Sequence, residues 1–155
     1  MNNYIEINKQ IESLISDTKY EITLLSNVSS FLYEVLDNVS WVGFYLYNKD
    51  DKELYLGPFM GKIACEIIKE GKGVCGNALS TLKTIRVDNV LEYPGHIACD
   101  SSSRSEIVIP ILLSNQKYGV LDIDSHSFSN FTKNDEEGLE ELVNIITKTL
   151  SRIKQ

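Results

Sequence analysis

The chain has 155 residues, of which 43% are hydrophobic and 24% charged, and a net charge of −7 at pH 7. These values fit one globular domain over residues 1–155, and the excess of acid argues against a surface that binds nucleic acid. No apolar run reaches the roughly 18 residues of a membrane-spanning helix, and the start, MNNYIEINKQ, lacks the features of a secretory signal. We therefore expect a cytoplasmic protein with no nucleic-acid or membrane partner.

The first third of the chain predicts two helices and a hairpin. Apolar residues recur at helical spacing over residues 4–18 and 20–36, which is typical of amphipathic helices. Residues 41–59 then change to two β-rich runs around the turn signal NKDD. Trp41, at the start of the first run, is either a core anchor or the wall of a pocket.

The middle of the chain is irregular. A Gly-punctuated stretch over residues 57–76 precedes a predicted short helix over 77–83. A short strand over 84–87 and a long loop over 88–103 follow. His126, beyond this region, lies in a polar turn and is expected to be solvated.

The last third predicts a hairpin and a helix. Residues 105–124 form two β-rich runs that turn near residues 114–116. Thr132 is the expected N-cap of the final helix, because acidic residues fill the turn after it. One apolar stripe on this helix predicts a core-packing face: Leu139, Leu142, Val143, Ile146, Leu150 and Ile153.

The order of these elements predicts an α+β fold. A central antiparallel sheet would carry the N- and C-terminal helices on one face. The long middle loops would cover the other face, which is a natural place for a pocket.

GKGVCG, residues 71–76, matches the G-x-G-x-x-G pattern of dinucleotide-binding loops. Such a site also needs a parallel β-α-β unit, which the chain does not predict here. We therefore interpret Gly71, Gly73 and Gly76 as residues that permit tight turns and the close approach of a ligand.

The three cysteines, Cys65, Cys75 and Cys99, are an odd number in a chain without an export signal. A static disulfide framework is therefore not expected, and inert core thiols, a metal site and redox or nucleophilic chemistry stay open. His96 and Cys99 have H-x-x-C spacing, but Cys65 and Cys75 lie ten residues apart. Structural zinc sites use closer pairs, so a Cys3His site is only weakly indicated.

LDID, residues 121–124, places Asp122 and Asp124 on one face of a strand and its Leu and Ile on the core face. If residues 114–116 form the hairpin loop, Glu106 lies opposite Asp124, whereas a two-residue loop would turn Glu106 away. Facing water, these acids would be solvated surface, which position alone favours slightly. Beneath a loop they would raise one another's pKa, hold a proton or neutralise an ammonium group.

Five strings together resemble the free methionine-(R)-sulfoxide reductases, which are stand-alone GAF-type domains: WVGFYL, GPFMGKIAC, GKGVCG, PGHIACDSSSRSEIVIP and GVLDIDS. The resemblance spans nearly the whole chain, and the cysteine spacings of ten and 24 residues match the family. Met60 and Ile63 stand where Gln and Pro are expected. These departures could alter the loop that carries Cys65, but they remove no thiol or acid.

The resemblance implies a role for each candidate residue. Cys99 would be the nucleophile and Cys65 the resolving thiol, with Cys75 as the third cysteine of the catalytic set. Trp41 would be an aromatic wall of the substrate pocket. Four acids match the substrate-binding acids of the family: Asp88, Glu106, Asp122 and Asp124.

The implied activity is thiol-dependent reduction of free L-methionine (R)-S-oxide to L-methionine. A thiolate attacks sulfur, an acid protonates the departing oxygen, and a second thiol captures the sulfenic acid in a redox-active disulfide. Thioredoxin would reset the enzyme, which would act against oxidative stress without a metal, nucleotide or other cofactor. A homodimer stays open.

Two other functions stay open beside this one. A non-catalytic GAF-type sensor of small molecules is the main alternative, since fold does not decide function. A sensor, however, has no need of three thiols beside four acids. A zinc-binding regulatory module is the third alternative.

Overall fold

The computed structural model describes residues 1–97 and 99–155. Within these residues, six strands form one antiparallel sheet in the order β3-β2-β1-β6-β5-β4. The strands are β1 (Trp41–Asn48), β2 (Glu53–Met60), β3 (Ile67–Lys69), β4 (Ile85–Val87), β5 (Ser105–Leu113) and β6 (Gln116–Ser125). The helices are α1 (Tyr4–Ile15), α2 (Glu21–Val35), α3 (Gly73–Thr81), the 3₁₀ helix η1 (Val90–Glu92) and α4 (Lys133–Ile153).

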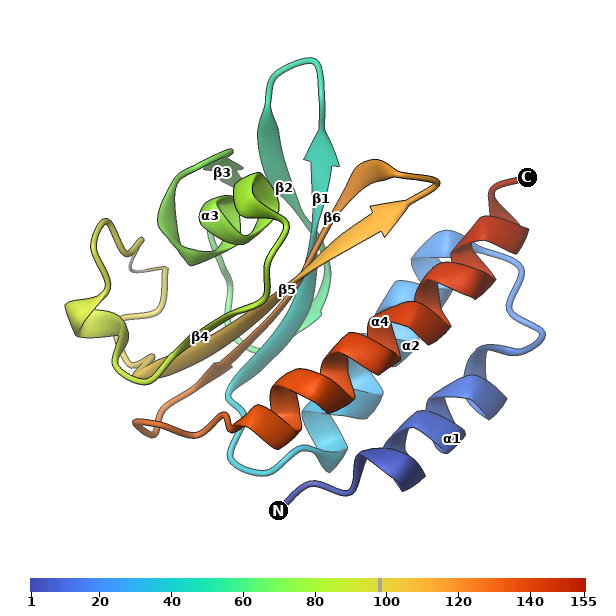
Figure 1. The fold of residues 1–155 in the computed structure, drawn as a ribbon, viewed down its shortest axis with the longest axis horizontal. Helices are drawn as coiled ribbons and strands as arrows, with labels where there is room; N and C mark the ends of the chain where they lie inside the picture. Colours follow the sequence, from blue (N-terminus) through green and yellow to red (C-terminus); the bar gives the residue numbers. More distant parts are fainter. Residues whose placement is uncertain (98) are drawn as a thin grey trace.

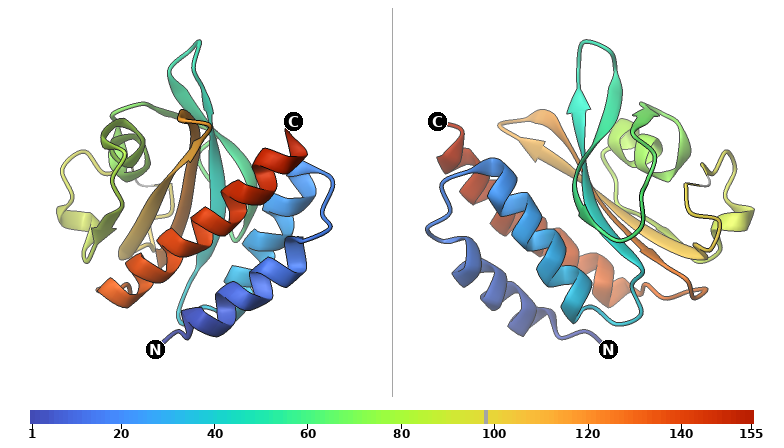
Figure 2. Two further views of the ribbon diagram at one scale, coloured as in Figure 1. Left: turned by 45° about the vertical axis from the view of Figure 1, so that its right-hand side comes forward. Right: turned by 180° about the vertical axis from the view of Figure 1, so that it is seen from behind.

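The sheet separates two layers (Figures 1 and 2). Helices α2 and α4 pack on one face, and α1 lies outside them against α4. Helix α3 and the loop after β4 lie on the opposite face. The predicted α+β architecture, with terminal helices on one face and a covered second face, is therefore confirmed.

The start of α4 follows local chemistry that the sequence predicts. The Thr132 hydroxyl accepts a hydrogen bond from the Asp135 N–H, and the Asp135 carboxylate accepts one from the Thr132 N–H at 2.8 Å. This capping box satisfies N–H groups that the first turn leaves without helical partners. The predicted stripe is also confirmed as core, with five members buried and Ile153 packed against them.

Helix α3 begins at Gly73, earlier than the predicted start at residue 77. Gly71 and Gly73 have φ of 82° and 62°, which lets the chain turn tightly into the helix. At Gly76 a Cβ would lie 2.5 Å from the Lys69 carbonyl oxygen, so its close approach is to the backbone of β3. The expectation that this glycine makes room for a ligand is therefore wrong. The strand pairs among residues 1–97 and 99–155 are all antiparallel, which leaves the dinucleotide pattern without its β-α-β unit.

The β5–β6 turn lies where it was predicted, near residues 114–116. Ser114 and Asn115 alone form it, between the paired residues Leu113 and Gln116. Both turn residues have positive φ, 52° and 61°, as a two-residue hairpin loop with the twist of its strands requires. Of the two loop lengths that the sequence left open, the two-residue loop is the one that forms.

A bulge in β6 nevertheless gives the register that a three-residue loop would have produced. Ile111 pairs with Gly119, but the next residue pairs with Lys117, so Tyr118 is an extra residue on β6. The extra residue shifts the rest of the ladder by one position. Glu106 consequently pairs with Asp124, as the three-residue loop had predicted.

The predicted loop over residues 88–103 contains η1. Residue 98, which belongs to the same predicted loop, lies outside the described residues. No helix in the described ranges combines the length and apolar character that a membrane crossing requires.

Candidate active site

The candidate site lies on the face of the sheet opposite α1, α2 and α4. Trp41 on β1 pairs with Asp124 on β6, which pairs with Glu106 on β5, so the three residues form a row across adjacent strands. Asp122 lies two residues before Asp124 and therefore faces the same side, beside Gly43. The intervening Ile and the preceding Leu of β6 are buried in the core under the helices, which directs both aspartates to the other face.

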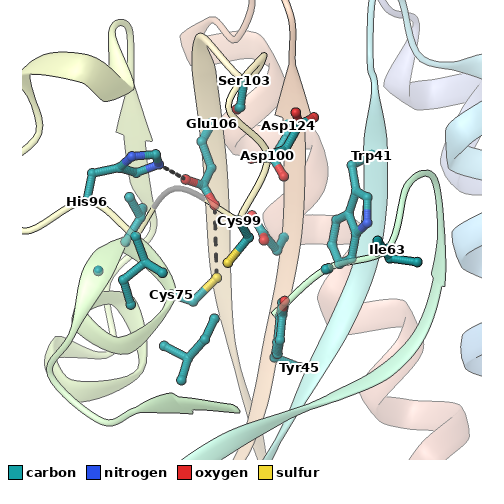
Figure 3. A pocket seen from close by; sticks show the side chains of 16 residues that line it. Trp41, Tyr45, Ile63, Cys75, His96, Cys99, Asp100, Ser103, Glu106 and Asp124 are labelled. Carbon is teal, nitrogen blue, oxygen red and sulfur yellow. Dashed lines mark hydrogen bonds and ion pairs between the residues drawn. The ribbon is translucent and has the colours of Figure 1, made fainter. Parts of the chain in front are cut away.

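A pocket lies over this row (Figure 3). Its empty space, which includes the solvent at the open mouth, is about 550 Å³. Helix α3 contributes Cys75, and the loop before β5 contributes His96, Ile97 and Cys99. Ile63, between β2 and β3, completes the rim.

The three pocket acids are not a solvated surface. Glu106 and Asp122 are only 6% and 5% exposed, and Asp124 is half-buried. Burial raises the pKa of Glu106 well above its usual value, and the charges of Asp122 and Asp124 add to the rise. Burial also raises the pKa of Asp124, with a contribution from Asp122. The cluster therefore retains protons in a pH range where isolated carboxyl groups have lost them.

Asp122 and His96 complete the electrostatics of the pocket. Burial raises the pKa of Asp122, although Glu106 and Cys75, as neighbouring hydrogen-bond donors, oppose the rise. Burial lowers the pKa of His96 against the pull of Asp122, so the imidazole is neutral at pH 7. Its Nε2 lies 3.9 Å from Glu106 Oε1, a contact between two largely uncharged groups rather than a strong ion pair.

Two buried polar atoms in the pocket lack partners among the described residues. They are the Ser103 hydroxyl oxygen and Asp122 Oδ1. Both residues line the cavity. A buried polar atom without a partner is costly, so both atoms are suited to bind a polar ligand.

Cys65 and Cys99 are joined in a disulfide, with 5.5 Å between their Cα atoms. Cys99 lies at the pocket and Cys65 just outside its lining. The pair is the one that the resemblance implies. The Cys3His zinc set is not assembled, because the disulfide occupies two of its four ligands.

Cys75 is the free, buried thiol of the set. Its Sγ is 4.0 Å from Glu106 Oε2. Burial raises its pKa well above the usual value, and the charges of Asp122 and Glu106 raise it further. Cys75 therefore stays a thiol at neutral pH, which does not suit it to attack a substrate.

Trp41 is both a core residue and a pocket wall. Its side chain is buried, stacks on Phe59 and Tyr45, and donates a hydrogen bond from Nε1 to the Lys62 carbonyl oxygen at 3.0 Å. Two glycines make room for the ring. A Cβ on Gly43 would lie 2.6 Å from the indole, and a Cβ on Gly61 would lie 2.5 Å from it.

We expect Gly43→Ala to displace Trp41 and weaken substrate use. The added methyl would also lie 2.4 Å from the Phe59 Cβ, so the stacked pair cannot keep its place. Such overpacking typically costs about 1–3 kcal/mol. We expect a shift in the fluorescence of this single tryptophan and a loss in kcat/KM of about tenfold or more.

Gly57→Ala is the matched control. It alters the same hairpin but crowds Phe44 and Leu46 instead of the indole. Its tryptophan emission should stay close to that of the parent protein. Unchanged emission and kcat/KM in folded Gly43→Ala would contradict the role of this glycine.

Two predicted residues lie apart from the pocket. Asp88 is exposed and is not among the lining residues, so its role in substrate binding stays a prediction. The side chain of Val87, the residue before Asp88, packs with buried residues next to the pocket. Successive side chains of an extended chain point to opposite sides, so the side chain of Asp88 is directed away from these buried residues. His126 is 49% exposed, as expected, and lies 3.3 Å from Asp100, beside Cys99.

The lining residues that sequence reasoning missed include Tyr45, Ile63 and Ile97. Tyr45 could have been found, because residues 41, 43 and 45 share one face of a strand. Ile63 and Ile97 lie in irregular segments, where periodicity gives no signal.

Comparison with known proteins gives consistent results. A GAF-domain family model matches residues 21–151. The free methionine-R-sulfoxide reductase of Escherichia coli K12 is 45% identical over 148 residues, which cover 96% of this chain and 88% of that protein.

Two solved structures are also similar. The Neisseria meningitidis free methionine-R-sulfoxide reductase in complex with its substrate has a TM-score of 0.95 and 41% identity, covering 98% of this chain and 90% of that one. The reduced form of the Staphylococcus aureus fRMsr has a TM-score of 0.92 and 49% identity, covering 97% and 96%.

Proposed function

This chain belongs to the GAF-domain family of free methionine-R-sulfoxide reductases, and from that membership we propose that it reduces free L-methionine (R)-S-oxide in the pocket over β1, β6 and β5. One observation supports the proposal above the others. The Cys65–Cys99 disulfide lies beside a cluster of acids that retain protons. Sulfoxide reduction needs this combination of a thiol pair and an acid.

The first step transfers the sulfoxide oxygen. The Cys99 thiolate attacks the sulfoxide sulfur, and the acid cluster protonates the oxygen, which leaves as water when its bond to the methionine sulfur breaks. This water then attacks the Cys99 sulfur and displaces methionine, so that the bond between the two sulfur atoms breaks and the oxygen stays on Cys99. Methionine sulfur gains two electrons, and Cys99 is oxidised by two electrons to a sulfenic acid. Glu106 and Asp124 are the proposed proton donors, because their raised pKa lets them keep protons at a higher pH than ordinary carboxyl groups do.

The second step forms the disulfide. The Cys65 thiol attacks the Cys99 sulfur and displaces hydroxide, which leaves as water. An external dithiol then reduces the disulfide, and we propose thioredoxin for this role. Because the cycle depends on a reducing dithiol supply, we propose a cytoplasmic location; a homodimer stays a prediction.

The substrate amine accounts for the preference for a free amino acid. Asp122 Oδ1 is buried without a partner in the described part of the chain, and we assign it to the ammonium group. Peptide-bound methionine has no such charge at that position. The stacked Trp41 forms one wall of the same pocket. We propose that residues 1–155 act together as one GAF-type domain.

Methionine formation from the two free sulfoxide epimers, with dithiothreitol as reductant, tests the proposal. We expect turnover of the R epimer and little of the S epimer. N-acetyl-methionine (R)-sulfoxide is the matched substrate without an ammonium group and should react far more slowly. Binding of free methionine sulfoxide without methionine formation would favour the alternative, a GAF-type sensor.

Turnover without reductant should produce one methionine per chain and leave Cys65 and Cys99 disulfide-bonded. Cys75 should remain alkylatable after denaturation, because it is buried and takes no part in the exchange. Peptide mapping by mass spectrometry measures both results. A predominant Cys75–Cys99 bond would instead transfer the resolving role to Cys75.

A further inference from the structure

Cys75 is a buried nucleophilic group that the proposed reaction does not use. It comes from α3, whereas Glu106 and Asp122 come from β5 and β6. One ligand atom from each of the three residues lies within 4.8 Å of the others. All three side chains are at least nine-tenths buried, and Figure 3 shows Cys75 and Glu106 facing each other at the pocket.

Asp122 supplies independent evidence for a cation. Its Oδ1 is buried and has no hydrogen-bond partner among the described residues, although the side chain is only 5% exposed. Such an atom needs a proton donor or a positive charge. The substrate ammonium is one such group, and a metal ion is another.

We propose that Cys75, Glu106 and Asp122 form a binding site for a thiophilic divalent cation such as Zn²⁺, which competes with the substrate. Cys75 is a thiol in the metal-free protein, so a bound cation would displace its proton to solvent. The resulting thiolate is a soft ligand and selects zinc-like ions over Mg²⁺ or Ca²⁺, which require more oxygen ligands. Two carboxylates and a thiolate match the three protein ligands of an open zinc site. Water from the pocket would occupy the fourth position.

The distances allow such a site after a small movement. Bonds of about 2.3 Å to sulfur and 2.0–2.2 Å to oxygen imply a sulfur–oxygen separation of about 3.5 Å in a tetrahedron. Cys75 Sγ and Glu106 Oε2 are 4.0 Å apart. A closure of roughly half an ångström is within reach of side-chain rotation.

The competition rests on the proposed function, because it assumes that the ammonium group of the substrate uses Asp122. Metal binding itself does not depend on catalysis. A metal at these three residues would occupy Glu106, which is one of the two proposed proton donors, and Asp122, which is the proposed ammonium ligand. Zinc would therefore act as a reversible inhibitor that requires no change in the fold.

Cadmium binding to the oxidised protein gives a direct test. With Cys65 and Cys99 in their disulfide, Cys75 is the remaining thiol of the chain. A thiolate–cadmium charge-transfer absorption must then arise from Cys75. We expect one equivalent of Cd²⁺ to produce this band, Zn²⁺ to displace it and Mg²⁺ to leave it unchanged.

Matched variants locate the site. Cys75→Ser should lose the band, and Asp122→Asn should weaken binding by at least about tenfold. His126→Ala is the control for metal binding at an exposed imidazole and should bind as the parent does. The absence of a band, or equal loss in His126→Ala, would overturn the proposed site. A band that persists in Cys75→Ser would overturn it as well.

A second titration separates this inference from the proposed function. Free methionine sulfoxide should raise the Cd²⁺ concentration needed for half-saturation, whereas free alanine controls for chelation in solution. An equal effect of alanine would overturn the competition. Cadmium binding without methionine formation would support the metal site but refute the proposed function. Methionine formation without cadmium binding would refute only the metal site.

Discussion

Cys99→Ser is expected to abolish methionine formation while the fold survives. A serine hydroxyl is a poor nucleophile at neutral pH and cannot form the sulfenic acid or the disulfide that complete the cycle. Cys75 cannot replace it, because burial and the neighbouring carboxylates keep Cys75 protonated. Turnover of the free R epimer with dithiothreitol should therefore fall below detection.

The control for Cys99→Ser must allow for the lost disulfide. That bond closes a segment with a sequence separation of 34 residues, and a loop of this length contributes about 3–4 kcal/mol in the chain-entropy model. Thermal melts of the variant should therefore be compared with reduced wild-type protein, and the two should agree. A folded Cys99→Ser protein with near-normal turnover would refute the assignment of the nucleophile.

The second large effect is expected at the acid cluster. Glu106→Gln and Asp124→Asn keep nearly the same shape but remove a group that can donate a proton as an acid. Loss of a general acid typically lowers the rate by about 10²- to 10⁴-fold. Both carboxyl groups have a raised pKa and face the pocket, so we expect kcat losses in this range.

Asp88→Asn is the matched comparison for these two variants. The resemblance implies that Asp88 binds substrate, but its side chain is exposed and lies outside the pocket lining. The geometry therefore predicts a kcat close to that of the wild type. An equal loss in Asp88→Asn would contradict the geometry, and wild-type rates in Glu106→Gln and Asp124→Asn would refute the acid role.

The acid cluster should also determine how stability depends on pH. The pKa of Glu106 is higher in the folded state than the value of about 4.3 expected after unfolding. The folded protein therefore binds more protons between these two values, and its free energy of unfolding falls as pH rises from about 4. Urea unfolding at several pH values should show a smaller decline for Glu106→Gln than for the wild type.

Several features could be read from local sequence. The capping box at Thr132 depends on residues three apart, and the core stripe of α4 depends on helical spacing. The alternation of LDID placed Asp122 and Asp124 on one face, because side chains in a strand alternate. These signals are local, so neighbouring residues were enough.

Other features depend on contacts that periodicity does not contain. Asp88 matched a family acid but is exposed and not among the residues that line the pocket. The need for glycine at positions 43 and 61 follows only from the position of the Trp41 indole, which leaves no room for a Cβ at either residue. The glycines of GKGVCG could be assigned to tight packing, but which backbone they meet depends on how α3 lies on β3.

The sequence by itself determined the fold class, the acidic face of β6 and, through a specific resemblance, the chemistry of sulfoxide reduction. Only the tertiary structure decided that Glu106 lies beside Asp124. The two-residue turn alone would have directed Glu106 to the other face, and the bulge at Tyr118 reversed that effect. Strand register and the Cys65–Cys99 contact both join residues that are far apart in the sequence, so neither is determined by any one segment.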